Sequence, residues 1–233
     1  DVITHSSVIN ACAKAYQWQG ALNMLDEMRS RGLVPDAITY NSVIDACAKG
    51  NEWQRALDLF DKMRNFNLTP DLVTYDAALN ACAIGRQPER ALSLFELLQQ
   101  EGLTAELSHW CHLLDALGPN HAQSCSLLLR MVEQPFFAGA ESFEAGMPKF
   151  DLHGLSAGAA EMFVRWWLTD RLPKRLEARK MSKPTQVMLV TGHGESRVLT
   201  EAGVVKQRVL ALADKLGTVV EQSNRGIVVL EWP

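Results

Sequence analysis

Apolar residues in the first half of the chain recur with helical spacing. Within residues 36–71 they form two stripes, each on one face of a helix: Val43, Ile44 and Cys47 on the first, and Ala56, Leu57, Phe60 and Met63 on the second. Asp36 and Thr39 offer capping side chains before the first helix. Gly50-Asn51 separates the two helices, and residues 67–70 end the second. The pattern predicts a helical hairpin whose apolar stripes must be buried against neighbours.

This hairpin pattern repeats every 35 residues. The tripeptide Ala-Cys-Ala stands at 11–13, 46–48 and 81–83, and threonines stand in register at Thr4, Thr39 and Thr74. A fixed period of this length is typical of solenoids, in which each unit packs only on its neighbours and the stack presents an extended binding surface. The first half is therefore expected to be an all-α solenoid of helical hairpins.

Beyond about Pro148 the 35-residue period is lost and the apolar spacing changes. Short strands are predicted at 150–153, 186–191, 218–222 and 226–231, with helices at about 156–171 and 200–216. The order βαβαββ predicts a small α/β sandwich with one right-handed crossover. The expected fold class is thus a helical-hairpin solenoid followed by an α/β sandwich.

Composition and charge fit two domains of different character. The 233 residues are 47% hydrophobic, which is enough for two cores. Residues 1–146 carry 10 Lys and Arg against 18 Asp and Glu, whereas residues 147–233 carry 13 against 9. If a polyanion is bound, the second half is expected to supply the non-specific attraction. No apolar run reaches the ~18 residues of a membrane span. No signal peptide is visible, and the start at Asp1 suggests a fragment or a processed product.

The five cysteines predict neither disulfides nor a zinc site. Cys12, Cys47 and Cys82 share one repeat position and are expected to be small core residues. Cys111 and Cys125 add no CxxC pair, and the odd count has no metal-ligand spacing. A reducing compartment fits best.

The repeats resemble pentatricopeptide repeats. The resemblance rests on the 35-residue spacing and on the strings AITYNSVIDACAKG (37–50), ALDLFDKMRNFNLTPD (56–71) and VTYDAALNACA (73–83). It covers about residues 2–106, with a degenerate fourth copy from Leu107 to about Met131. The expected domains are three repeats at 1–106, a capping repeat and linker at 107–147, and the second domain at 148–233.

The resemblance implies binding of single-stranded RNA with one base per repeat. In this family a polar residue early in the first helix and the last residue of the repeat choose the base. Ser6 with Asp36 would favour guanine, Asn41 with Asp71 would favour uracil, and the two acids Asp76 and Glu106 have no assigned base. The alternative is that these residues only cap helices and turns.

At two further repeat positions, the recurring residues have both a structural interpretation and an RNA-binding one. Trp18 and Trp53 are expected to be packing residues rather than stacking platforms for bases. Lys14 and Lys49 recur in register and could meet phosphates, although a solvated surface position is the simpler reading.

Two motifs in the second half fall where open α/β sheets place their sites, beyond the carboxyl ends of strands. They are DLHGL (151–155) and TGHGESR (191–197). They resemble the aspartate-x-histidine motif and the threonine-glycine-x-glycine loop of small MutS-related (Smr) domains, over about residues 148–233. The resemblance implies nucleic-acid nicking or RNA endonuclease activity. Pentatricopeptide repeats followed by an Smr domain form an organellar class, which would place the protein in a plastid or mitochondrion.

The candidate site residues follow from these motifs. The catalytic candidates are Asp151, His153 and His193. The candidates for holding phosphate or the RNA backbone are Thr191, Gly192, Gly194 and Arg197, together with Arg175, Arg179 and Lys180 from a basic stretch at 171–183. A histidine can act as general base toward the 2′-hydroxyl of RNA. Alternatively, a divalent metal held by Asp151 would activate water.

The leading expectation is RNA binding coupled to RNA cleavage in organellar RNA processing. Single-stranded RNA is the expected partner, without a membrane or a small-molecule cofactor. Three alternatives stay open: a non-catalytic RNA-binding protein that stabilises a transcript or aids its translation, a protein-interaction scaffold, and a DNA-nicking enzyme. The sequence gives neither the target RNA nor the oligomeric state.

Overall fold

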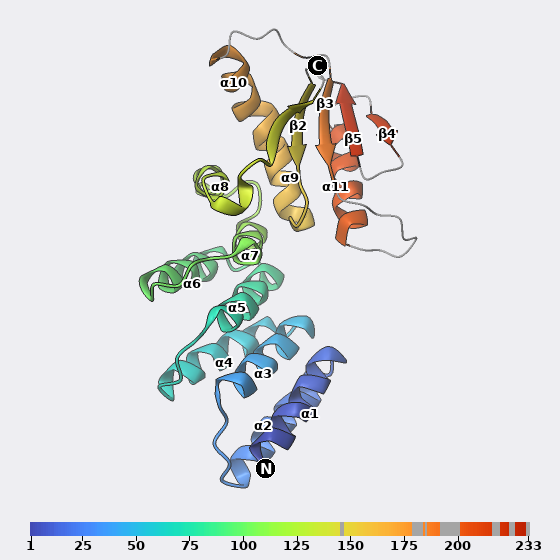
Figure 1. The fold of residues 1–233 in the computed structure, drawn as a ribbon. Helices are drawn as coiled ribbons and strands as arrows, with labels where there is room; N and C mark the ends of the chain where they lie inside the picture. The colour runs from blue at the N-terminus through green and yellow to red at the C-terminus, as the bar shows by residue number, and fades with distance from the viewer. Residues whose placement is uncertain are drawn as a thin grey trace. The chain divides into compact units, whose positions relative to one another are not determined.

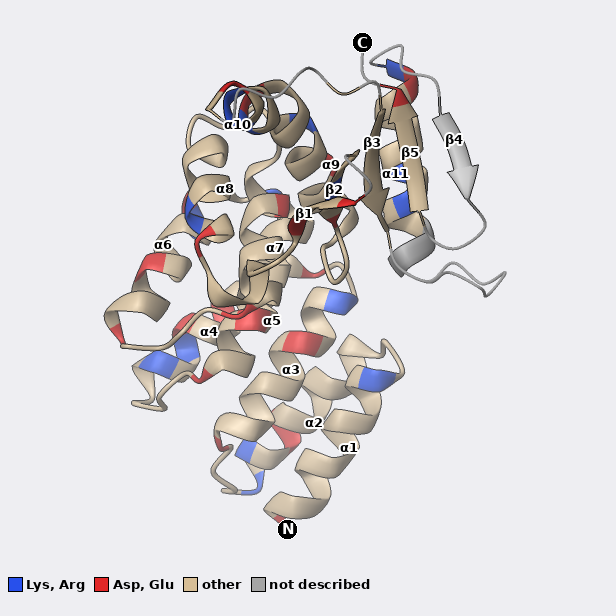
Figure 2. Cartoon of the chain, turned by 45° about the horizontal axis from the view of Figure 1, so that its top comes forward, with Lys and Arg blue, Asp and Glu red and all other residues tan. Residues whose placement is uncertain are grey.

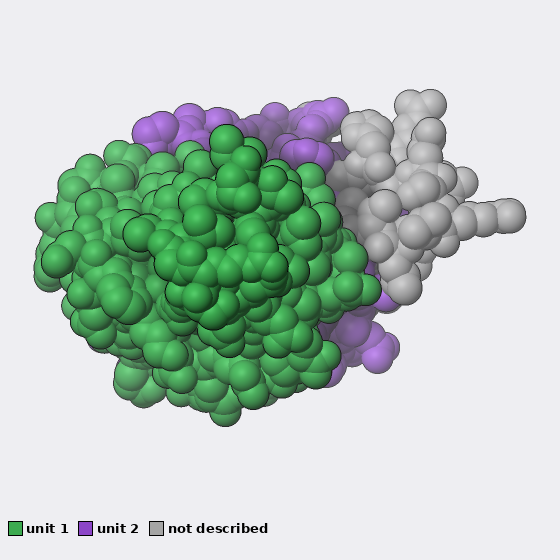
Figure 3. All heavy atoms as spheres, turned by 90° about the horizontal axis from the view of Figure 1, so that it is seen from below, with its two compact units in different colours: residues 1–117 green, residues 118–233 purple. Residues whose placement is uncertain are grey.

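The computed structural model describes residues 1–144, 147–178, 184, 186–191, 201–215, 220–223 and 227–231. The chain divides into two compact units, Asp1–Leu117 and Gly118–Pro233, which Figure 3 colours separately. The domain boundaries expected from the sequence, at 106 and 147, stay predictions. Among the described residues, no helix combines the length and apolar character that a membrane crossing needs.

Unit 1 is a stack of helical hairpins (Figure 1). Its helices are α1 (Val2–Lys14), α2 (Trp18–Ser30), α3 (Ala37–Lys49), α4 (Trp53–Asn65), α5 (Leu72–Gly85), α6 (Pro88–Gln100) and α7 (Leu107–Leu117). The odd-numbered helices contact one another in sequence, and each even-numbered helix packs on the two odd-numbered helices beside it. The predicted helical solenoid is therefore confirmed.

The helix boundaries follow from capping side chains and from left-handed residues. Asp1, Asp36 and Asp71 are the N-caps of α1, α3 and α5, and each carboxylate accepts the backbone N–H three residues later. Such a cap satisfies one of the N–H groups that a helix start leaves unpaired. Tyr16, Asn51 and Arg86, 35 residues apart, take left-handed φ angles of 56°, 63° and 48° where the first helix of each repeat ends. One repeated local signal thus sets the length of each first helix.

Aromatic side chains join each repeat to the next. Phe60 on α4 packs on Tyr75 of α5 with ring centroids 5.4 Å apart, and Phe95 on α6 packs on Trp110 of α7 at 4.6 Å. All four rings are buried. Such pairs add stabilisation beyond the apolar area that they bury, so the core runs continuously through the stack.

Unit 2 contains a five-stranded sheet. Its elements are α8 (Ser124–Val132), a 3₁₀ turn (Pro135–Phe137), β1 (Glu141–Glu144), β2 (Met147–Asp151), α9 (Ala157–Trp166), a π-helical turn (Trp167–Arg171), α10 (Leu172–Ala178), β3 (Gln186–Val190), α11 (Glu201–Lys215), β4 (Val220–Ser223) and β5 (Ile227–Glu231). The strand order is β1-β2-β3-β5-β4, and only β2 and β3 run parallel. The predicted small C-terminal sheet is present.

Two details of unit 2 differ from the sequence prediction. The order βαβαββ is found from β2 onward, but an additional strand, β1, precedes it and pairs antiparallel with β2 from Glu141↔Phe150 to Glu144↔Met147. This strand has four residues and a single apolar side chain, Phe143, which is too little alternation for a pattern to detect. The single helix predicted at 156–171 ends as α9 at Trp166 and continues through the π-helical turn into α10.

Candidate nucleic-acid interface

The polar pair predicted in the first repeat is bridged by a threonine of the second. Ser6 Oγ lies 2.8 Å from Thr39 Oγ1, and Thr39 Oγ1 donates to Asp36 Oδ1 at 2.7 Å. The backbone N–H of Thr39 donates to the same carboxylate oxygen at 2.8 Å. Ser6 and Asp36 are therefore joined through one hydroxyl group, across the boundary between two repeats.

The second pair contacts directly. Asn41 Nδ2 donates to Asp71 Oδ1 at 3.0 Å, and Thr74 Oγ1 lies 2.6 Å from Asn41 Oδ1 and 2.8 Å from Asp71 Oδ1. Burial works against the charged form of Asp71, but hydrogen bonds from Thr74 and Asn41 outweigh it and lower its pKa below the ordinary value. Asn41 is only 8% exposed, so its amide orientation is fixed.

The third pair is arranged differently because His109 stands where the other repeats have threonine. His109 Nδ1 accepts the backbone N–H of Glu106 at 3.2 Å, and Nε2 lies 3.0 Å from the carbonyl oxygen of Leu72. Asp76 lies instead beside His112, with Oδ1 3.7 Å from Nε2. Burial opposes the charge of Asp76, whereas Ser108 and His112 lower its pKa, with a net decrease. No bridge between Asp76 and Glu106 is found among the described contacts.

Three exposed aliphatic side chains accompany these pairs, and the sequence analysis missed them. Ile3, Ile38 and Val73 are 77%, 67% and 62% exposed and stand 35 residues apart. Each precedes Ser6, Asn41 or Asp76 by three residues and therefore shares its side of the helix. The repeat period could have found them, because an apolar residue that recurs off the buried stripe has no packing role. The surface formed by these six residues is called the first-helix face below.

The predicted site in unit 2 lies at the carboxyl ends of β2 and β3. These strands pair in parallel with Asp151 opposite Val190, and the N–H of Leu152 donates to the carbonyl of Val190 at 2.8 Å. Asp151 Oδ1 accepts the backbone N–H of His153 at 2.9 Å, and His153 is exposed. Thr191, directly after β3, is 3% exposed. The two motifs therefore begin at one edge of the sheet.

The remaining predicted residues of this site fall outside the described residues. They are Gly192, His193, Gly194, Arg197, Arg179 and Lys180. Arg175 is described, and its guanidinium pairs with the carboxylate of Glu141. Within the described ranges, no three His, Cys, Asp or Glu side chains gather in a way that could hold a metal ion. The catalytic and phosphate-binding roles stay predictions.

Comparison with known proteins bears on the repeats. The profile described as "PPR repeat family" matches residues 1–49 and 35–84, and the profile described as "PPR repeat" matches residues 73–103. Residues 1–103 are pentatricopeptide repeats. No curated protein matches the chain significantly.

Solved structures show the same fold. The pentatricopeptide repeat protein PPR10, in complex with an 18-nt psaJ RNA element, matches at 20% identity and a TM-score of 0.54 over 93% of this chain. Another crystal structure of PPR10, from maize, matches at 20% identity and a TM-score of 0.52. The pentatricopeptide repeat domain of Arabidopsis thaliana protein-only RNase P 1, in complex with tRNA, matches at 13% identity and 0.52, covering 92% of this chain and 88% of that one. The chain spans only 28% of the PPR10 chain.

The lysines of the pentatricopeptide repeats differ in their surroundings. Lys49 Nζ donates to Asp45 Oδ2 at 2.7 Å, whereas Lys14 is exposed at the end of α1. The third copy has Ile84 at this position. Figure 2 shows positive and negative residues interspersed over the helices of unit 1. A phosphate contact by Lys14 or Lys49 stays a prediction.

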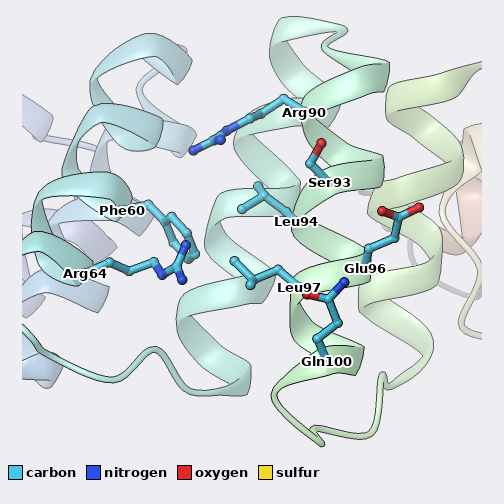
Figure 4. Close-up of a pocket in the computed structure, with 8 residues that line it drawn as sticks. All are labelled: Phe60, Arg64, Arg90, Ser93, Leu94, Glu96, Leu97 and Gln100. Carbon is cyan, nitrogen blue, oxygen red and sulfur yellow. The ribbon is translucent and has the colours of Figure 1, made fainter.

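A hollow of about 260 Å³ lies between the second helices of two adjacent pentatricopeptide repeats, α4 and α6 (Figure 4). Phe60 and Leu94 lie within it, and Arg64 and Arg90 extend across it. Each arginine has a carboxylate partner: Arg90 pairs with Asp61, and Arg64 lies 3.9 Å from Glu101. The hollow thus lies between two repeats, and both of its arginines are paired with carboxylates. It is formed by α4 and α6, whereas the first-helix face is on α1, α3 and α5.

Proposed function

We propose that this protein binds single-stranded RNA through the first-helix face. The observation that supports the proposal most strongly is the hydrogen-bonded pair Asn41–Asp71 beside the exposed side chains of Ile38 and Val73. A polar pair fixed by the protein's own hydrogen bonds can read the edge of a base, and an aliphatic side chain can cover its face. Both contacts need unpaired bases, so the partner is a single strand.

The relatives support the same partner. PPR10 was solved with an RNA element, and the repeat domain of protein-only RNase P 1 with tRNA. Residues 1–117 carry 9 Lys and Arg against 15 Asp and Glu, so general attraction to phosphates is weak in unit 1. Affinity must then come from contacts to bases. Ser6 with Asp36 would select guanine, and Asn41 with Asp71 would select uracil.

Fluorescence anisotropy of the full chain with a labelled 12-nucleotide RNA containing GU tests this proposal. The double variant Ile38→Ser and Val73→Ser should bind about tenfold more weakly, since contacts to a base contribute about 1–3 kcal/mol. The matched control is Val34→Ser, because Val34 is 78% exposed in the loop between α2 and α3 and is not one of the six residues of the first-helix face. Equal losses in both variants, or equal affinity for the duplex form of the RNA, would reject the proposal.

As a finer proposal, unit 2 is an Smr-like RNA endonuclease. Asp151 anchors the turn by accepting the N–H of His153, and the exposed imidazole of His153 is available to a substrate. His153 would take the proton of the 2′-hydroxyl, whose oxygen attacks phosphorus while the 5′-oxygen departs and His193 returns a proton. The products would be a 2′,3′-cyclic phosphate and a 5′-hydroxyl. Thr191, Gly192, Gly194 and Arg197 would hold the phosphate.

Cleavage of end-labelled RNA by the full chain distinguishes a mechanism with His153 as general base from one with a metal-activated water. Loss of cleavage in the His153→Ala variant, with unchanged RNA affinity, supports the assignment of His153. Undiminished cleavage by the double variant Asp151→Asn, His153→Ala rejects it. A 5′-phosphate product that disappears in chelator would favour a metal-activated water held by Asp151. If no RNA is cleaved at all, the function reduces to binding that stabilises a transcript or aids its translation.

The cellular setting follows only from the resemblance. Repeats joined to an Smr-like domain would place the protein in RNA processing within a plastid or mitochondrion. Imaging of the full-length protein fused at its C-terminus to a fluorescent protein tests this, and a purely nuclear signal would contradict it.

A further inference from the structure

We propose that unit 2 contains a second anion site, a hollow beside α10 that binds one phosphate group of a ribonucleotide. The hollow has a volume of about 340 Å³ and is lined by Leu129, Trp166, Asp170, Arg171, Lys174 and Arg175. All six residues belong to α8, α9, the π-helical turn and α10. The site is distinct from the ends of β2 and β3, and it does not depend on the repeats.

Two arginines of the hollow are held in place by a buried carboxylate. The side chain of Glu141 is 8% exposed, and its Oε2 lies 3.4 Å from Arg171 Nε and contacts Arg175 Nη1. Its other oxygen, Oε1, accepts the indole N–H of Trp167 at 3.0 Å. The described contacts use one nitrogen of each guanidinium, so the remaining N–H groups can bind a second anion.

Aromatic rings fix the planes of both guanidiniums. Arg171 lies over the ring of Trp166 at 5.6 Å, and Arg175 lies over Phe143 at 5.9 Å. Trp166 and Arg171 are five residues apart, a spacing that does not face on an α-helix. The π-helical turn brings them together, because its hydrogen bonds join residues five apart. In this turn the backbone N–H of Leu172 donates to the carbonyl oxygen of Trp167. Such turns are frequent at functional sites.

The charge balance selects the ligand. Arg171, Lys174 and Arg175 bring three positive charges, and Asp170 and Glu141 bring two negative charges. The surplus of one positive charge favours an anion, and the oxygens of a phosphate group, in a monoester or a diester, match the arginine fork. Figure 2 shows the positive and negative residues close together along α10.

The indole N–H of Trp167 provides a direct reporter, since it donates to the carboxylate that the two arginines share. An ¹H–¹⁵N spectrum of the full chain is titrated with uridine 5′-monophosphate, inorganic phosphate or uridine at pH 7.5. The Trp167 indole signal, assigned with Trp167→Phe, should shift saturably with the first two and not with uridine. The indole signals of Trp18 and Trp53, which lie in unit 1, should stay in place.

Two variants test the residues. Arg171→Gln should raise the dissociation constant about tenfold or more, because a charge-assisted hydrogen bond is lost. Lys174→Gln should raise it less and leaves the contacts of Glu141 intact. The control is Lys206→Gln on α11, a cation that does not line the hollow. No shift with phosphate, an equal shift with uridine, or equal affinity of Arg171→Gln and Lys206→Gln overturns the proposal.

Tetrauridylate with and without a 5′-phosphate identifies the source of the phosphate. Tighter binding of the phosphorylated form indicates a pocket for RNA ends, and equal binding indicates a contact to the backbone. Either result supports the site. The titration needs only uridine 5′-monophosphate and does not require RNA binding by the repeats. If the Trp167 signal does not shift, the proposal that the repeats bind RNA still stands. If the repeats do not bind RNA, the titration still tests the anion site.

Discussion

Asn41, early in the second repeat, contacts Asp71, the last residue of that repeat: its Nδ2 donates to Oδ1 at 3.0 Å. The same oxygen accepts the backbone N–H of Thr74 at 2.9 Å and caps α5. One carboxylate oxygen therefore starts the helix of one repeat and orients the polar side chain of the repeat before it. The ability of Asn41 to read a base depends on the fold of its neighbour.

Asp71→Ala should destabilise the protein by about 1 kcal/mol at pH 7, as expected for a lost N-cap. The pKa of Asp71 is lowered in the folded state, so its contribution is present above the unfolded value, near 3.8, and is lost as the pH falls through the lowered folded pKa. The difference in the free energy of unfolding between Asp71→Ala and wild type should therefore shrink below about pH 4.

Urea unfolding between pH 7 and pH 2.5 measures this difference. Asp58→Ala is the control, because Asp58 is exposed on α4 and caps no helix. A destabilisation by Asp71→Ala that is the same at every pH would contradict the role given to its carboxylate.

Trp18 and Trp53 pack on glycines of the following repeat, which confirms their prediction as packing residues. A Cβ at Gly50 would lie 2.3 Å from Trp18 Cδ1, and one at Gly85 would lie 2.4 Å from Trp53 Cδ2. Gly50→Ala and Gly85→Ala should each destabilise the protein by about 1–3 kcal/mol through overpacking.

A double-mutant cycle checks the cause. In the background of Trp18→Ala the indole is gone, so Gly50→Ala should cost little, and the two changes should couple favourably. The same holds for Gly85 with Trp53. Additive losses in thermal unfolding would show that the strain at residue 50 has another origin.

The cysteines should differ sharply in reactivity. Burial raises the pKa of Cys47 to about 11 and that of Cys82 to about 12, so neither forms much thiolate at pH 8. Cys125 is exposed on α8. Mass spectrometry after brief treatment with iodoacetamide should find Cys125 alkylated and Cys47 and Cys82 intact, whereas all five react in urea. Modification of Cys47 in the native protein at the rate of Cys125 would contradict the packing of the repeats.

The solenoid could be predicted because its signals are local and repeated. Asp36 caps α3 as expected, Asp71 caps α5 in the same way, and the apolar stripes of the hairpins are buried. The different arrangement of the third polar pair is only partly predictable. The sequence shows that Asp76 and Glu106 are an unusual pair of acids. It does not show the cause, which is that His109 replaces the bridging threonine. That replacement matters only through contacts between repeats, which a linear pattern does not reveal.

The details of unit 2 were less predictable. β1 exists because it pairs with β2 and places Glu141 against Trp167, Arg171 and Arg175, all distant in sequence. The sequence predicts that the basic stretch at 171–183 holds the RNA backbone but does not predict its secondary structure, and its first part forms α10. Ile3, Ile38 and Val73 lie off the buried apolar stripes, so the pattern that predicts the helices does not predict a role for them.

The central claim is that the first-helix face reads RNA bases. The most direct test replaces the base-reading pair of the second repeat with that of the first. In Asn41→Ser, the second repeat acquires the pair found in the first, so its preference should change from uracil to guanine. Affinities of the full chain are measured for two single-stranded RNAs that differ only in having GU or GG. Wild type should prefer GU by about tenfold, at about 1–3 kcal/mol per base, and Asn41→Ser should prefer GG, while Ser42→Ala on the same helix should behave as wild type. An unchanged ratio of the two affinities in Asn41→Ser would contradict the account.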